Sequence, residues 1–223
     1  MNGAGKPSLG RRLRPMLGVF ILTLPVAMTA RGVPDDVQSP WRMITETAQG
    51  RLYHRVVEGS SFPEVMIVTR LEAPPSRVRA AVTDYDRFAE FIPNVAESRV
   101  LQQEGGRQWV FHRLHFGAPF ADRVYVIESS EAASRPRENH YRIEWTLSAR
   151  RFPALDETGG VNPRALSGFW DLRPLAHGNA TEAAYAVHCD PGGFMPGWLV
   201  ETMTDRYIQQ VIVAVRLRIA KDG

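Results

Sequence analysis

The stretch that decides the fold is WLVETMTDRYIQQVIVAVRLRIAK, residues 198–221. It contains neither proline nor glycine, and its apolar side chains recur every three or four positions, which is helical periodicity: Val200, Met203, Tyr207, Val211, Ala214, Val215 and Leu217. At about 1.5 Å per residue this helix spans roughly 35 Å, enough to cross a small domain. The preceding Asp190-Pro191-Gly192-Gly193 predicts a turn that no strand can cross. We therefore expect the rest of the chain to fold around this last helix.

Most of the chain before that turn has the patterns of β-strands. Residues 52–57 and 64–71 are rich in β-branched side chains and flank Gly59-Ser60-Ser61, which is typical of a hairpin. In residues 141–148, apolar Tyr141, Ile143, Trp145 and Leu147 alternate with polar side chains, which indicates an antiparallel strand with one wet face. Further strands are predicted over residues 95–103, 108–116, 123–129, 168–174 and 181–189.

Shorter helices are predicted at three places. Residues 41–48 are expected to form a helix that ends at Gly50, and residues 85–93 an aromatic-rich helical turn that ends at Pro93. Between them, Ser76 is the expected N-cap of a helix that runs to Asp84. Helices gathered on one face of an antiparallel sheet make the fold class α+β.

The N-terminus predicts an export signal. Basic residues (Lys6, Arg11, Arg12 and Arg14) precede the apolar residues 16–30, a length that fits a signal peptide and is short for a membrane span. The expected organisation is a signal peptide over residues 1–32, a linker over 33–40 and one folded domain over 41–223. The expected location is the periplasm, after cleavage of the signal; an uncleaved membrane anchor is the alternative.

Charge and residue spacing argue against several functional classes. The formal net charge is +3, but no basic run with interleaved aromatic residues occurs, so no nucleic-acid partner is predicted. Cys189 is the only cysteine, which excludes an intramolecular disulfide. The six histidines are dispersed, and neither a Gly-x-Ser-x-Gly motif nor a phosphate-binding glycine loop occurs. The sequence therefore predicts no catalytic residue, no metal and no cofactor.

Four segments resemble the START-like, helix-grip proteins, a superfamily that includes the polyketide cyclases. They are DYDRFAEFIPNV (84–95), FGAPFADR (116–123), SGFWDLRP (167–174) and DPGGFMPGWLV (190–200), they follow the family order, and the resemblance covers roughly residues 41–221. A departure is Val124, which stands where many members have Asp. The resemblance implies a curved antiparallel sheet wrapped around the long C-terminal helix, with a hydrophobic tunnel between them. Members carry sterols, phospholipids, ceramides, quinones or polyketides, and a minority are cyclases or hydrolases.

Arg123 is the most informative polar residue of this tunnel. Strand parity puts Arg123, Tyr125 and Ile127 on one face, which by the resemblance lines the tunnel. A buried guanidinium must be paired or hydrogen-bonded, so Arg123 either pairs with a protein acid or binds a ligand phosphate or carboxylate. Other side chains expected to line the tunnel, or else to form a filled aromatic core, are His112, Leu114, Tyr141, Trp145, Trp170, Tyr185, Met203 and Tyr207.

The segment Arg150–Leu166 is long for a connection inside a compact domain. We expect it to cover the tunnel mouth beside the start of the last helix. Near that mouth, Arg150, Arg151, Phe152 and Trp198 either contact an anionic membrane surface transiently or belong to an ordinary solvated loop.

Together with these patterns, the resemblance implies a monomeric protein that binds a hydrophobic small molecule or lipid without catalysis; transfer of that ligand is a further possibility within this hypothesis. This hypothesis predicts a cavity of roughly several hundred Å³. The alternative is a cyclase- or hydrolase-like enzyme of the same fold, which predicts an acid and a base that converge in the tunnel. A third hypothesis is an interaction module whose pocket is filled.

Overall fold

The structure is a computed structural model that describes residues 40–155, 159–193 and 197–221. The predicted signal peptide and almost all of the predicted linker lie outside the described residues. Within the described ranges, no helix combines the length and the apolar composition that a membrane span requires.

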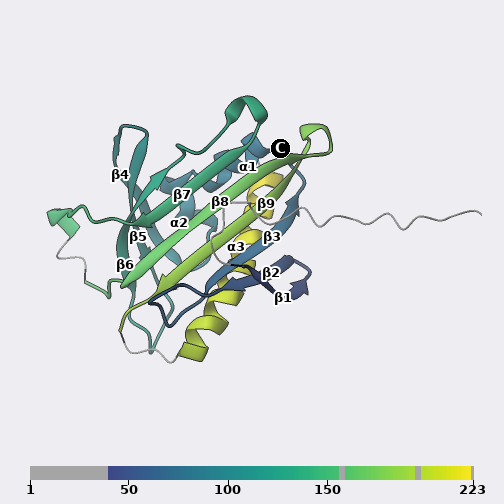
Figure 1. The fold of residues 1–223 in the computed structure, drawn as a ribbon. Helices are drawn as coiled ribbons and strands as arrows, with labels where there is room; N and C mark the ends of the chain where they lie inside the picture. Colours follow the sequence, from purple (N-terminus) through teal and green to yellow (C-terminus); the bar gives the residue numbers. More distant parts are fainter. Residues whose placement is uncertain (1–39, 156–158, 194–196, 222–223) are drawn as a thin grey trace, which may run out of the picture. The chain divides into compact units, whose positions relative to one another are not determined.

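Nine strands of the described chain form one antiparallel sheet in the order β1-β2-β3-β9-β8-β7-β6-β5-β4. The strands are β1 (Arg42–Thr47), β2 (Gly50–Arg55), β3 (Glu64–Leu71), β4 (Val95–Glu104), β5 (Arg107–Leu114), β6 (Arg123–Ser130), β7 (Tyr141–Leu147), β8 (Ala165–Leu175) and β9 (Ala180–Asp190). Strand β3 pairs with β9 from Glu64↔His188 to Leu71↔Thr181, so the first strands are joined to the last one. The sheet therefore has β1 and β4 at its two edges (Figure 1).

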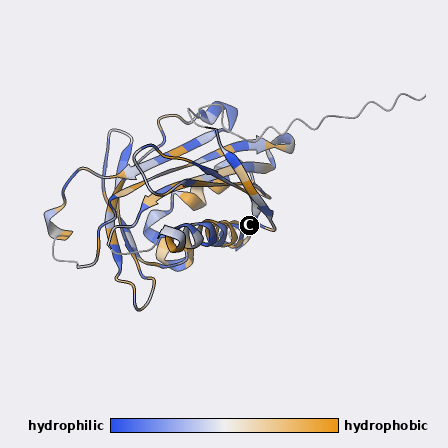
Figure 2. Ribbon diagram, turned by 60° about the horizontal axis from the view of Figure 1, so that its bottom comes forward, coloured by the Kyte–Doolittle hydropathy of each residue, from blue (hydrophilic) through white to orange (hydrophobic). Residues whose placement is uncertain are grey.

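The three α-helices of the described chain lie on one side of this sheet (Figure 1). They are α1 (Pro75–Val82), α2 (Phe88–Phe91) and the long α3 (Gly197–Lys221), and the short 3₁₀ helices are η1 (Tyr85–Arg87), η2 (Pro136–Glu138), η3 (Pro153–Leu155) and η4 (Ala176–Gly178). Figure 2 shows the sheet curving over α3. The α+β helix-grip architecture expected from the sequence is confirmed.

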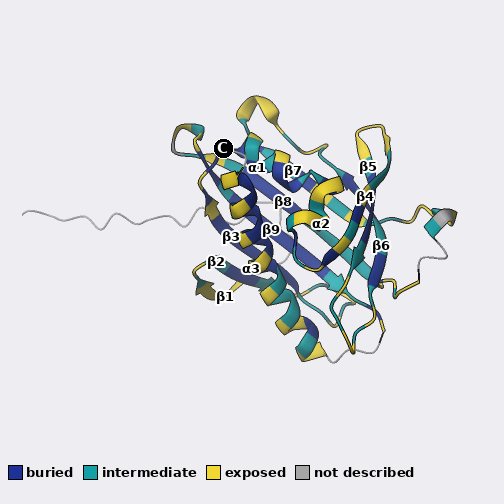
Figure 3. Ribbon diagram, turned by 180° about the vertical axis from the view of Figure 1, so that it is seen from behind, coloured by how far each residue is buried: buried dark blue, intermediate teal, exposed yellow. Residues whose placement is uncertain are grey.

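Helix α3 is held by one buried stripe. Ile208, Ile212 and Val215 are completely buried, while the outer side of the helix is exposed (Figure 3). The stripe is shifted from the one predicted, because Leu217 faces solvent and Ile219 is buried in its place. Burying side chains of this size contributes about 1.5–3 kcal/mol each, so the stripe anchors the helix to the sheet.

Residues 41–48 do not form the predicted helix. Arg42–Thr47 is an edge strand paired with β2 from Arg42↔His54 to Thr47↔Gly50. Gly50 does not end a helix but belongs to β2, with φ +146°, and a Cβ there would lie 2.5 Å from the Val68 carbonyl oxygen. Most β1 side chains are exposed, so the pairing of backbone groups with β2, rather than an apolar pattern, determines this element.

Two further expectations need correction. Helix α1 begins at Pro75 with Pro74 as its N-cap, so Ser76 is not the cap. Proline suits this first position because its φ is preset and its missing N–H would have no helical partner. The predicted loop Arg150–Leu166 is shorter than expected, since Ala165 and Leu166 already belong to β8 and Pro153–Leu155 forms a 3₁₀ helix.

Candidate functional site

A cavity of about 180 Å³ lies between the sheet and α3. It is smaller than the several hundred Å³ predicted, because large aromatic side chains occupy part of the space. Trp170 stacks on Tyr185 with ring centroids 4.2 Å apart, and the Trp145 ring lies 5.9 Å from Tyr185. These side chains therefore fit both predicted alternatives, since they line the cavity and also pack on one another as an aromatic core.

The side chains predicted to line the tunnel converge here, with one exception. Tyr141 is not part of the described lining: it shares a strand face with Trp145 but sits at the other end of β7, where the Arg79 guanidinium lies 5.6 Å from its ring. The predicted residues that do line the cavity are His112, Leu114, Arg123, Tyr125, Trp145, Trp170, Tyr185, Met203 and Tyr207. That they contact a ligand stays a prediction.

Several lining residues were not predicted from the sequence. Cys189 was not among the side chains predicted to line the tunnel, and Phe88 belongs to a short helix with no sequence pattern that points inward. Strand parity could have found the β9 positions, since Tyr185, Val187 and Cys189 alternate along one face. Lining residues missed by the prediction include Phe88, Leu166, Val187, Cys189, Val211 and Val215.

Arg123, the first residue of β6, is buried in the cavity wall. Its Nε donates a hydrogen bond to the Pro191 carbonyl (2.7 Å), Nη1 to that of Ala121 (2.5 Å) and Nη2 to that of Gly192 (3.3 Å). Main-chain carbonyls were not among the partners predicted from the sequence, which were an acid or a ligand anion. The guanidinium thus ties the turn that precedes α3 to the start of β6.

The second half of the predicted mouth loop lies where it was expected. Pro163 and Leu166 line the cavity, and Val161 exchanges main-chain hydrogen bonds with Asp122 and Val124 beside Arg123. A Cβ at Gly192, which has φ +64°, would lie 2.7 Å from the Asn162 carbonyl oxygen. The loop therefore packs directly on the turn before α3, and this close approach needs the glycine.

His112 is a deeply buried titratable group of the lining, with 5% of its surface exposed. Its imidazole stacks on Phe88 with centroids 5.9 Å apart, and the Tyr125 ring lies at 5.5 Å. Within the described part of the chain, Nδ1 finds no hydrogen-bond partner. Burial lowers the pKa of His112 to about 4, so the ring is neutral at pH 7.

Three phenols and one thiol add further polar surface to the cavity, besides Tyr85 and Thr204, whose hydroxyls are already hydrogen-bonded. Burial raises the pKa values of Tyr125, Tyr185 and Tyr207, and their mutual proximity adds to the effect on Tyr125 and Tyr185. Burial likewise raises the pKa of Cys189 to about 12. No hydrogen bond joins these three hydroxyls to another residue of the described ranges. All four groups are therefore neutral at physiological pH and face the cavity.

The described lining carries no carboxylate and no lysine. Within the described ranges, no group of three or more His, Cys, Asp or Glu side chains is placed to hold a metal ion. The acid–base pair that a cyclase- or hydrolase-like enzyme would need could thus draw only on His112, the phenols and Cys189 in this part of the chain.

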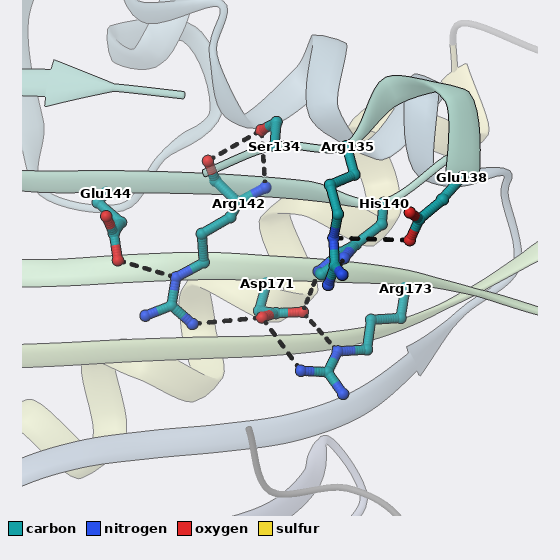
Figure 4. A network of polar contacts seen from close by, with 8 residues as sticks. All are labelled: Ser134, Arg135, Glu138, His140, Arg142, Glu144, Asp171 and Arg173. Carbon is teal, nitrogen blue, oxygen red and sulfur yellow. Dashed lines mark hydrogen bonds and ion pairs between the residues drawn. The ribbon is translucent and has the colours of Figure 1, made fainter. Parts of the chain in front are cut away.

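A polar network lies on the opposite face of the sheet from the cavity (Figure 4). Asp171, adjacent to Trp170 in β8, is 4% exposed and accepts hydrogen bonds from His140 Nε2 (3.0 Å), Arg142 Nη1 (3.3 Å) and Arg173 Nε (2.9 Å). Since successive side chains of a strand point to opposite faces, this network cannot touch a molecule in the cavity. Its role is to hold β7, β8 and the loop after β6 together.

Comparison with known proteins assigns the chain to a family. Residues 71–216, more than half of the chain, match the family model described as polyketide cyclase / dehydrase and lipid transport. The chain belongs to this family. Its START-like, helix-grip fold agrees with the resemblance found in the sequence.

Relatives of the family span almost the whole described domain. The chain is 25% identical over 189 residues to uncharacterized protein PA1579 of Pseudomonas aeruginosa. The aligned region covers 84% of this chain and 90% of that protein. The structure of a STAR-related lipid transfer protein (fragment 25–204) from Xanthomonas axonopodis matches with a TM-score of 0.71 and 23% identity, over 81% of this chain and 98% of that one. Human StAR-related lipid transfer protein 5 matches with a TM-score of 0.70 and 12% identity, over 83% and 89% of the two chains. At these identities the structural matches show a shared fold.

His112 makes the stability of this family member depend on pH. Its pKa is about 4 in the folded protein and 6.5 in the reference state, so between these pH values only the unfolded chain takes up the proton. The free energy of unfolding should therefore fall by about 3 kcal/mol as pH drops from 6.5 to 4. Urea unfolding of the wild type and of His112→Phe at several pH values measures the contribution of His112 to the free energy of unfolding. The other titratable groups are the same in the two proteins, so their contributions cancel in the difference. The exposed His177, changed to Asn, is the control, because its side chain makes no hydrogen bond to a described residue. A wild-type-minus-variant difference for His112→Phe that stays constant with pH would contradict the assignment.

Proposed function

We propose that this protein binds a hydrophobic small molecule or lipid in the cavity between the sheet and α3, and carries it without chemical conversion. The observation that supports this most directly is the cavity itself, whose walls are apolar and aromatic side chains from β5–β9 and α3. A concave, mostly apolar site with a few polar groups is the usual form of a small-molecule site. The family description, which includes lipid transport, and the lipid transfer protein of the same fold support the proposal.

The chemistry of the described lining supports binding rather than catalysis. A thiol whose pKa is raised to about 12 is a weak nucleophile at neutral pH. An imidazole whose pKa is lowered to about 4 is a weak base, since an efficient catalytic base has a pKa near the working pH. The described lining contains no carboxylate that could act with either group and make it a better nucleophile or base.

The alternative is a cyclase- or hydrolase-like enzyme acting on a hydrophobic substrate. The observation that favours it is the contact between His112 and Tyr125, whose centroids lie 5.5 Å apart inside the cavity. The family description also names cyclases and dehydrases. A recovered ligand that is converted on incubation with the protein, and not with His112→Phe, would favour this alternative.

Native mass spectrometry of protein purified gently from its own host tests the proposed function. The expected spectrum contains a complex with an apolar compound of constant mass, which lipid extraction then identifies. The matched variants are Leu114→Trp, which fills part of the cavity from a half-buried position, and Leu217→Ala on the exposed side of α3. Leu114→Trp should lose most of the bound compound and Leu217→Ala should keep it. Repeatedly empty spectra of the wild type would contradict the proposal.

The remaining expectations on location and partners are part of the proposal. Export to the periplasm rests on the charged and apolar residues of positions 1–32. Transient membrane contact is supported by Trp198, which is 69% exposed at the first turn of α3. Arg150 supports it less, because its guanidinium pairs with Glu104 and lies over the Trp109 ring. We further propose that the protein acts as a monomer and has no nucleic-acid partner.

A further inference from the structure

We infer that the ligand is an uncharged hydrophobic molecule that carries a hydroxyl group, and that His112 and the cavity phenols recognise this hydroxyl. This inference rests on the proposed function and deepens it, since it names the chemical class that the cavity accepts. Three sets of observations carry it: the charge state of the lining, its unused hydrogen-bonding groups and their grouping.

The lining offers little to a charged ligand. Among the described lining residues the one formal charge belongs to Arg123, whose guanidinium already donates to the carbonyls of Ala121, Pro191 and Gly192. The phenols, the Cys189 thiol and the His112 imidazole are all neutral at pH 7. A carboxylate or phosphate that left water for this cavity would therefore lose its hydration without a fully available counter-charge.

The lining offers several hydrogen-bonding atoms to an uncharged polar group. A neutral imidazole has one donor and one acceptor nitrogen, and neither nitrogen of His112 has a partner in the described part of the chain. Nδ1 is itself fully buried, so Nε2 is the nitrogen that a ligand can reach. The hydroxyls of Tyr125, Tyr185 and Tyr207 likewise make no hydrogen bond to a described residue. Such groups are buried at a cost unless they are paired, so a ligand that pairs with them gains affinity over one that cannot.

These groups lie close together rather than scattered over the wall. The Tyr125 ring is 5.5 Å from His112, and Tyr207, Cys189 and Tyr185 are near enough to raise the pKa of Tyr125. The residues come from three places in the fold, β5–β6, β9 and α3, so only the closed structure assembles them. A hydroxyl both donates and accepts, so it can pair with an imidazole nitrogen and a phenol at once, whereas an ether or ketone oxygen only accepts.

The test compares three unbranched ligands of ten carbon atoms each on the full-length protein at pH 7.5. The ligands are decan-1-ol, its isomer 1-methoxynonane, which can accept but not donate a hydrogen bond, and decanoate, which is charged. Binding is followed by tryptophan fluorescence, because Trp145 and Trp170 line the cavity. We expect decan-1-ol to bind at least tenfold more tightly than either of the other two, which corresponds to about 1.4 kcal/mol.

Each outcome decides a separate statement. Equal binding of the alcohol and the ether, or tighter binding of decanoate, would overturn the inference and leave the proposed function intact. Binding of none of the three would overturn the proposed function as well.

His112→Phe keeps an aromatic ring in the same place and removes both nitrogens. It should reduce the preference for alcohol over ether at least fivefold while the Kd of the ether changes less than twofold. His112→Gln, which keeps a donor and an acceptor, should retain part of the preference, and His115→Phe on the exposed surface should retain all of it. An unchanged preference in His112→Phe would overturn the role of His112. If that variant does not fold, the wild-type ratios and Tyr125→Phe, which removes one phenol hydroxyl, decide the inference.

Discussion

Gly168→Ala should lower the free energy of unfolding by about 3 kcal/mol, because a single added methyl group has no room at this position. Gly168 lies in β8 opposite Val187 of β9. A Cβ there would lie 2.5 Å from Cζ2 of Trp145 and would overlap the carbonyl oxygen of Ala186. That carbonyl is main chain in a central strand and cannot move without disturbing the ladder, so both Trp145 and β9 must shift.

Urea unfolding and tryptophan emission together measure this effect. Trp145 lines the cavity, so its displacement should change the emission spectrum of the folded variant and weaken ligand binding along with stability. Gly197→Ala is the matched control, because a Cβ at this helical position would meet no atom of the described residues within 4 Å. Equal unfolding free energies for the two alanine variants would show that β8 and Trp145 do not pack as described.

Asp171→Ala should also lower the free energy of unfolding by about 3 kcal/mol, since it removes the acceptor at the centre of the outer network. His140, Arg142 and Arg173 all donate to this carboxylate, and His140 and Arg142 are too buried to be fully solvated without it. Glu144→Ala is the control: Glu144 also pairs with Arg142, at 3.0 Å, but its side chain is 51% exposed. An exposed pair of this kind is worth less than about 1 kcal/mol.

The Asp171 contribution has a defined pH window. Burial acts to raise the pKa of Asp171, but hydrogen bonds and charge from Arg173 and His140 outweigh it, so the pKa lies below its ordinary value of 3.8. The stabilisation is therefore complete above pH 3.8 and is lost as pH falls below it. The difference in unfolding free energy between the wild type and Asp171→Ala should shrink in that range. A difference that grows on acidification would contradict the network.

The elements that the sequence predicted well are those with a strong local period. The last helix was expected over residues 198–221 and occupies Gly197–Lys221. The strand pattern of residues 141–148 gave the right faces, with Ile143 completely buried and Glu144 exposed. The helix predicted over residues 41–48 was wrong, because an edge strand has one partner strand and few buried side chains. Its alternation of apolar and polar residues is therefore weak, and pairing with β2 decides its conformation.

The candidate site was predicted in outline and not in its contacts. Parity placed Tyr125, Trp145 and Tyr185 on the inner face, but it also placed Tyr141 there, since alternation says which face a residue occupies and not how far along the strand the cavity extends. The hydrogen bonds of Arg123 could not be predicted, because their acceptors at Pro191 and Gly192 are 68 and 69 residues away.

The sequence by itself determined the long last helix, the alternation of the strands and the family. Each of these depends on residues that are close together in the chain, so a short stretch of sequence is enough to predict it. Only the tertiary structure decided that the cavity is small, that Arg123 binds main-chain carbonyls, and that the neutral His112 lies beside uncharged phenols. The physical reason is that volume, burial and hydrogen-bond partners depend on side chains from distant strands and α3, which meet only when the sheet closes around that helix.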